Sequence, residues 1–228
     1  MRALPEREDV PRAVGGSASR WTIGALADEA RRLADGRDRC LLGIAGAPGA
    51  GKSTLASALL ELLEPDAVVV GMDGFHLANR VLVEDGLLER KGAPETFDAA
   101  GFRILLARLR TNDDEVVYAP EFHREIEEPI AGAVAVPRAV TIVVVEGNYL
   151  LLDDGPWQGV RDLFDEVWYL DLDGRTRRER LLRRHVAFGK SPEDARSWVR
   201  DSDERNAALV EGTAGWADKV VRAPVQRA

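Results

Sequence analysis

Short apolar runs alternate along the chain with amphipathic segments, and this alternation predicts most of the secondary structure. Continuous apolar runs between turn signals are typical of strands that are buried on both faces of a sheet. Such β-prone runs predict five strands, at residues 40–45, 67–70, 141–145, 166–172 and 219–222.

Apolar residues three and four positions apart predict helices between these strands. The predicted helices cover residues 23–34, 55–63, 98–109, 175–188 and 191–209. The region 115–137 has no clear period, and we expect it to be irregular with short extended pieces. Because strands alternate with helices, the sequence predicts a three-layer α/β fold with a parallel sheet.

The length of 228 residues suits one domain. Residues 1–20 mix Pro, Gly and both signs of charge, and they predict a flexible N-terminal arm before a domain at 21–228. Within the domain, Gly189 and Lys190 separate two predicted helices and suit the hinge of a helical lid at about residues 175–195.

Composition and charge exclude several classes of function. The formal net charge of −8 argues against a general nucleic-acid binder. The apolar runs are too short to cross a bilayer, and residues 1–20 lack the apolar core of a signal peptide. A single cysteine, Cys40, excludes an internal disulfide and predicts a packed thiol. We therefore expect a cytoplasmic protein without membrane or nucleic-acid partners.

A glycine-rich segment between the first predicted strand and the next helix matches the phosphate-loop pattern G-x-x-x-x-G-K-S, also called Walker A. In this pattern backbone N–H groups surround a phosphate, the lysine reaches the β- and γ-phosphates, and the hydroxyl binds Mg²⁺. Lys52 and Ser53 take these two roles. The predicted ATP-binding residues are Gly46, Ala47, Pro48, Gly49, Ala50, Gly51, Lys52, Ser53 and Thr54.

Two carboxylates follow predicted strands and therefore lie at the same edge of the sheet as the phosphate loop. Asp73 comes after the second strand and could accept the proton of an attacking hydroxyl. Glu146 comes after the third strand, where this architecture usually holds magnesium or its waters. Neither an Asn-Lys-x-Asp segment nor a Leu-Ser-Gly-Gly segment is present, which argues against a GTPase and a transporter-type ATPase.

The predicted helix at 175–188 is strongly basic. Arg177, Arg180 and Arg184 share one face, which could close over phosphates and stabilise charge on the group being transferred. A solvated arginine surface is the alternative for each of them.

Taken together, these motifs resemble the uridine kinase and type I pantothenate kinase branch of the phosphate-loop kinases. More narrowly, the chain is similar to bacterial nucleoside/nucleotide kinase-like or fructose-kinase-like proteins of that branch. The resemblance covers about residues 39–221, and its markers are 46–53, 72–76, 90–98 and 146–151.

The resemblance implies a P-loop NTPase fold with a five-stranded parallel sheet and a helical lid. It places the catalytic base on Asp73 and the lid arginines on Arg177 and Arg184. It also implies an acceptor-binding role for several residues, namely Asp73, His76, Arg90, Lys91, His123, Arg124, Tyr149 and Asn206. Relatives are often dimers or tetramers, so the resemblance allows a homodimer.

The sequence also departs from both named subfamilies. Uridine kinases usually carry Asp-Ser-Phe-Tyr where this chain has the segment 73–76, and pantothenate kinases have Asp-Gly-Phe-Leu-His there. Basic residues at Arg90, Lys91 and Arg124 slightly favour an acceptor with an acidic or strongly polar group.

We therefore expect an ATP-dependent kinase, with ATP and Mg²⁺, that phosphorylates a hydroxyl of a sugar, nucleoside or pantothenate-like acceptor. Two alternatives remain. One is a nucleotide-binding regulatory protein on a kinase scaffold, and the other is a nucleoside monophosphate kinase that uses Arg90 and Arg124 to hold an acceptor phosphate.

Overall fold

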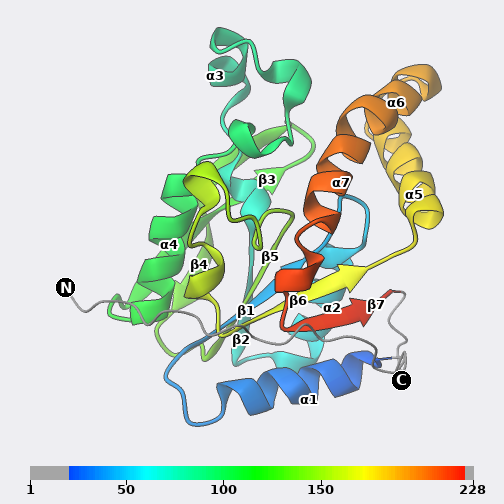
Figure 1. Ribbon diagram of the computed structural model, residues 1–228. Coiled ribbons are helices and arrows are strands. Elements are labelled where there is room, and N and C mark those ends of the chain that lie inside the picture. Colours follow the sequence, from blue (N-terminus) through cyan, green and yellow to red (C-terminus); the bar gives the residue numbers. More distant parts are fainter. Residues whose placement is uncertain (1–20, 224–228) are drawn as a thin grey trace.

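The computed structural model describes residues 21–223. The predicted N-terminal arm, at residues 1–20, lies outside the described residues. Five strands form one parallel sheet in the order β2-β5-β1-β6-β7 (Figure 1). Their bounds are β1 Cys40–Ala45, β2 Ala67–Gly71, β5 Ile142–Gly147, β6 Glu166–Asp171 and β7 Lys219–Arg222. The predicted five-stranded parallel sheet is confirmed.

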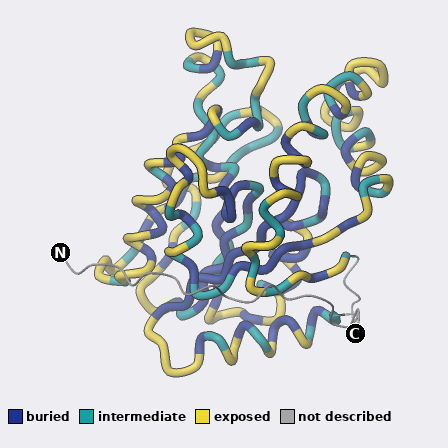
Figure 2. The backbone as a smooth tube through the Cα atoms, viewed as in Figure 1, coloured by how far each residue is buried: buried dark blue, intermediate teal, exposed yellow. Residues whose placement is uncertain are grey.

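Alternate side chains of the central strands enter two separate cores, one on each face of the sheet. In β1, Leu41 and Ala45 join one core, while Leu42 and Ile44 join the other. The helices α1 (Ile23–Ala34) and α2 (Lys52–Leu63) cover the second face. Helix α4 (Ala99–Thr111) covers the first face, so the strands lie in the buried middle layer (Figure 2).

Cys40 opens β1 and is fully buried. Burial raises the pKa of its thiol to about 12, so the thiolate needed for reaction is scarce at neutral pH. This agrees with the predicted packed thiol.

The region 115–137 differs from the prediction. It forms an antiparallel hairpin of β3 (Val116–His123) and β4 (Glu128–Pro137), with a register shift between Ala119 and Glu121. The alternation of apolar and polar residues is weak here because most of β4 is exposed and Pro120 interrupts the pairing. Val117, Ala119 and Val136 nevertheless join the first core, so pairing between the strands and this limited burial together hold the hairpin in place.

The predicted helix at 191–209 is divided into three segments. Helix α6 (Pro192–Trp198) is followed by a π-helical turn (Val199–Asp203) and then by α7 (Glu204–Glu211). The inserted turn changes which side chains face the rest of the molecule, and such turns are frequent at functional sites. Helix α5 (Gly174–Ala187) precedes them and packs against α6.

A short helix that the periodicity did not predict, α3 (Asn79–Glu84), lies opposite α5 and α6 at the same end of the molecule (Figure 1). Within residues 21–223, no helix combines the length and the hydropathy needed for a membrane span.

Candidate active site

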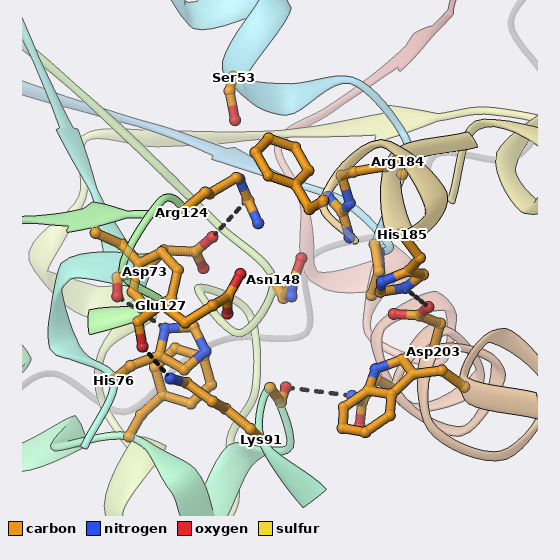
Figure 3. A pocket seen from close by; sticks show the side chains of 18 of the residues that line it. Ser53, Asp73, His76, Lys91, Arg124, Glu127, Asn148, Arg184, His185 and Asp203 are labelled. Carbon is orange, nitrogen blue, oxygen red and sulfur yellow. Dashed lines mark hydrogen bonds and ion pairs between the residues drawn. The ribbon is translucent and has the colours of Figure 1, made fainter. Parts of the chain in front are cut away.

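A cavity of about 470 Å³ opens at the carboxyl edge of the sheet. The phosphate loop and the ends of β2 and β5 form its floor, while α3, the turn of the hairpin, α5 and the π-helical turn supply its walls (Figure 3). A second cavity, of about 460 Å³, shares part of the phosphate loop with the first and is lined by residues 49–55, by residues of α1 and α5, and by Arg124.

The phosphate loop needs glycine at Gly49 for two reasons. Its φ of +81° is a conformation that other residues rarely adopt. A Cβ atom at this position would also lie 2.8 Å from Leu181 Cγ and 3.1 Å from the carbonyl oxygen of Arg177. The loop therefore packs directly against α5, which keeps the basic helix next to the predicted phosphate site.

Lys52 is buried at the start of α2 and is held by acceptors of the loop. Its Nζ donates hydrogen bonds to the carbonyl oxygens of Gly46 at 2.9 Å and Ala47 at 3.4 Å, and to Asn148 Oδ1 at 2.6 Å. Burial lowers the pKa of Lys52, while the nearby carboxylate of Glu146 acts in the opposite direction. Asn148 was not among the predicted site residues, although it follows Glu146 by two positions.

Ser53 and Glu146 come together as a pair. Ser53 Oγ donates a hydrogen bond to Glu146 Oε1 at 2.9 Å. Burial raises the pKa of Glu146, and the positive charge of Lys52 opposes this shift. Within residues 21–223 no cluster of three His, Cys, Asp or Glu side chains could hold a metal alone. One hydroxyl and one carboxylate nevertheless suit Mg²⁺, because this ion takes much of its coordination from phosphates and water.

Asp73 lies in the short helical turn after β2 and faces the same cavity (Figure 3). One carboxylate oxygen forms an ion pair with Arg124 Nη2 at 3.5 Å. Burial alone raises the pKa of Asp73, but the neighbouring groups His76, Arg124 and Lys52 together outweigh burial and leave the pKa lowered. The carboxylate is therefore ionised at neutral pH and can accept a hydrogen bond from a hydroxyl.

The two predicted lid arginines differ in position. Arg184 lines both cavities, and it approaches the first one from the wall opposite Arg124 (Figure 3). Arg177 is only 3% exposed, lines neither cavity, and pairs with Glu204 at 2.6 Å. The position of Arg177 supports a packing role between α5 and α7 and does not support the predicted phosphate contact.

Some of the other predicted acceptor-binding residues line the first cavity, and others do not. His76, Lys91, Arg124 and Asn206 line the first cavity. Arg90, His123 and Tyr149 do not line it.

The three residues outside the cavity have partners elsewhere. Arg90 pairs with Glu95 at 2.6 Å, and His123 lies 3.4 Å from Glu121. The hydroxyl of Tyr149 donates to the carbonyl oxygen of Gly92 at 2.6 Å, where Asn206 Nδ2 also donates at 3.2 Å. Tyr149 therefore holds the 90–98 segment in place from behind the cavity wall.

Several cavity residues have no motif that would have revealed them. His185 and Asp203 lie 2.7 Å apart and join α5 to the π-helical turn. Phe122, Glu127 and Trp198 line the cavity from the hairpin and α6. Only the tertiary structure brings these side chains together.

A phosphate loop at the edge of a parallel sheet, with carboxylates after two strands and an arginine helix beside it, defines the class of phosphate-loop kinases. No family model matches the chain. A solved structure from Silicibacter sp. TM1040, described provisionally as a kinase of a fructose transport system, is 38% identical with a TM-score of 0.78. The match covers 87% of this chain and 98% of that one.

Curated proteins give the same result. A Schizosaccharomyces pombe protein, named provisionally as a uridine kinase, is 34% identical over 82% of this chain and 84% of its own length. A pantothenate kinase of Nocardioides sp. is 35% identical over 65% of this chain and 50% of its own length. The chain belongs to the phosphate-loop kinases of the uridine kinase and pantothenate kinase branch, and it is a phosphotransferase with an alcohol group as acceptor.

Proposed function

We propose that the protein transfers the γ-phosphoryl group of ATP to a hydroxyl of a small molecule bound in the first cavity. The observation that carries this proposal is the common cavity of Lys52, the Ser53–Glu146 pair, Asp73 and Arg184. In this proposal ATP lies along residues 46–54, and the second cavity, which is lined by residues 49–55, provides room for the rest of the nucleotide.

Each residue then has a separate task. Lys52 leaves its loop carbonyls to bind the β- and γ-phosphates, and Ser53 and Glu146 hold magnesium. Bound Mg²⁺ supplies positive charge that offsets the charge on the phosphate oxygens. Arg184 and Arg124 approach from opposite walls and stabilise the negative charge on the group in transit.

The transfer itself needs mainly positioning. Asp73 accepts a hydrogen bond from the acceptor hydroxyl and orients its oxygen toward the γ-phosphorus. A bond forms between that oxygen and phosphorus, the bond from phosphorus to the bridging oxygen breaks, and ADP leaves with the bond electrons. The hydroxyl proton passes to Asp73. Closure of the lid at about residues 175–195, about the hinge at Gly189, would exclude water during this step.

The candidate acceptors are a sugar, a nucleoside and a pantothenate-like compound. Relatives carry names from all three groups: fructose for the Silicibacter structure, uridine for the Schizosaccharomyces protein and pantothenate for the Nocardioides protein. A nucleoside monophosphate kinase is less well supported. It would use Arg90 and Arg124 together to hold the acceptor phosphate, but Arg90 pairs with Glu95 outside the cavity and only Arg124 lines it.

An ATP-consumption screen over sugars, nucleosides, pantothenate and glycerate tests the proposal, with the wild-type protein and Asp73→Asn side by side. We expect ADP and a phosphorylated product in equal amounts from at least one acceptor, and a loss of about 100-fold or more in kcat for Asp73→Asn. ATP binding without any phosphorylated product would favour the regulatory alternative.

A further inference from the structure

Two of the positive side chains at the acceptor end of the cavity already have polar partners. We define the acceptor end as the part lined by α3, residues 88–92, the hairpin turn and residues 188–206. Lys91 Nζ donates hydrogen bonds to Asn79 Oδ1 at 2.5 Å and to the backbone oxygen of Glu127. Arg124 is paired with Asp73.

The charges that line this end balance. Three cations, Lys91, Arg124 and Lys190, line it together with three carboxylates, Glu89, Glu127 and Asp203. A carboxylate or phosphate on the acceptor would therefore meet no excess of positive charge to offset the cost of removing it from water.

Arg184 does not change this balance. In the described part of the chain its guanidinium has no hydrogen bond or ion pair, but it lines both cavities beside Lys52 and Ser53. Its charge is therefore available to the phosphates of the nucleotide. The basic residues that slightly favoured an acidic acceptor in the sequence are either engaged or, like Arg90, outside the cavity.

His76 presents a hydrogen-bond acceptor to the same space. Its ring packs against Phe97, at 4.0 Å between centroids, and against Phe122, at 4.8 Å. His76 lines the cavity, and the Nδ1 edge of its ring faces the backbone of Asp73, so the opposite edge with Nε2 is the one left to the cavity. Nδ1 lies 2.8 Å from the carbonyl oxygen of Asp73, so Nδ1 carries the hydrogen and Nε2 carries the lone pair.

Burial keeps this arrangement, because it lowers the pKa of His76 and so favours the neutral ring. A neutral Nε2 without a hydrogen accepts from an O–H or N–H group and gives no stabilisation to an anion. The aromatic rings of Phe122 and Trp198 add apolar surface, and Lys190 Nζ lies 4.1 Å from the centroid of Trp198. Rings of this kind suit the C–H faces of a sugar-like molecule.

We propose that the acceptor is an uncharged polyhydroxy compound, and that Nε2 of His76 accepts a hydrogen bond from a hydroxyl other than the one that reacts. This inference rests on the proposed function, because it names the substrate class of the same site. It makes His76 a specificity-determining residue that leaves the phosphoryl transfer itself to other side chains.

Matched acceptor pairs test the charge of the substrate. The full-length protein would be assayed for ADP release and product mass with glycerol against D-glycerate and with pantothenol against pantothenate, and with D-fructose, D-ribose and uridine. Within each matched pair we expect the neutral compound to be the better acceptor. We expect the best neutral compound to exceed both anions by about 100-fold in kcat/KM.

Two substitutions test the role of His76 with the best neutral acceptor. His76→Phe keeps an aromatic ring against Phe97 and Phe122 but removes the acceptor atom, and we expect kcat/KM to fall about 10- to 100-fold, mainly through KM. His76→Gln offers an oxygen near the position of Nε2 and should recover most of this loss. Deoxy analogues of that acceptor each lack one hydroxyl. With the analogue that lacks the hydroxyl bound by His76, wild type and His76→Phe should have the same kcat/KM.

The outcomes separate the two proposals. A higher kcat/KM for D-glycerate or pantothenate than for every neutral acceptor overturns the substrate class and leaves the kinase function standing. An unchanged KM in a folded His76→Phe protein overturns the role of His76. Phosphorylation of none of these compounds counts against the inference and the proposed function together.

Discussion

The two ends of the active-site cavity are built in different ways. At the phosphate end, consecutive residues of one loop and the start of α2 supply Lys52 and Ser53, and Glu146 adds one partner from β5. At the acceptor end, each wall comes from a different part of the chain, including the hairpin turn and the π-helical turn. A local motif therefore specifies the first end, while tertiary packing assembles the second. Substitutions at the two ends should therefore differ in their effects on activity and stability.

The largest effect is expected at the phosphate end. Lys52→Ala removes the cation proposed to bind the β- and γ-phosphates, and we expect kcat to fall by on the order of 10³-fold or more. Asp73→Asn should have a smaller effect, because transfer depends more on charge stabilisation than on proton removal. Steady-state kinetics with a thermal unfolding control measures both. Near-normal kinase activity in Lys52→Ala would refute the assignment of the phosphate end.

Two arginines of one helix sharpen the comparison. Arg184→Ala should reduce kcat about 10- to 100-fold with little change in Tm, because its guanidinium faces the cavities. Arg177→Ala should instead destabilise the fold by about 1–3 kcal/mol, because it removes a buried partner of Glu204.

Thermal unfolding and kinetics on both variants separate these effects. A stable Arg177→Ala protein with a large loss of kcat would restore the phosphate contact predicted for Arg177. The matched pair is informative because both residues are arginines on the same face of α5, two helical turns apart.

The fold was largely predictable from the sequence, because buried parallel strands leave continuous apolar runs. The hairpin was not, since β4 is mostly exposed and owes its structure to pairing with β3. The same limit applies to the site. Helical spacing placed Arg177 and Arg184 on one face, but it could not show that the phosphate loop packs against the part of α5 at Arg177 and leaves Arg184 at the cavity.

The acceptor end was the least predictable part. Tyr149 and Arg90 belong to the markers of the family, yet Tyr149 holds Gly92 from behind the wall and Arg90 pairs with Glu95. The His185–Asp203 pair depends on a π-helical turn that no sequence pattern indicated. A motif identifies residues near a site, whereas the direction of each side chain depends on its neighbours.

Gly74 stands where uridine kinases usually carry serine, and it belongs to the turn that carries Asp73 and His76 at the cavity. A Cβ atom there would lie 2.4 Å from the carbonyl oxygen of Pro120, which is backbone of β3. Gly74→Ser should therefore push the hairpin away from the turn that carries Asp73 and His76. We expect a loss of about 1–3 kcal/mol in stability and a higher KM for the acceptor, with the KM for ATP nearly unchanged.

Gly24 provides a control for this substitution, because a Cβ there would meet nothing within 4 Å. Denaturant unfolding and kinetics of Gly74→Ser and Gly24→Ser would be compared. Equal stability of the two variants would contradict the close packing between the hairpin and the turn.

The smallest expected effect is a pH dependence of stability that arises at the acceptor end. Burial lowers the pKa of His76 below its ordinary value of 6.5, so the unfolded chain takes up this proton at a higher pH than the folded protein. Acid therefore favours the unfolded state, and the free energy of unfolding falls as the pH drops below about 6.5. The slope from one proton is at most about 1.4 kcal/mol per pH unit.

Urea unfolding of wild type and His76→Gln from pH 7.5 to 5 isolates this contribution, because His123 and His185 are common to both proteins. A slope that is equal in the two proteins would mean that His76 keeps an ordinary pKa and that its ring is not held neutral by burial.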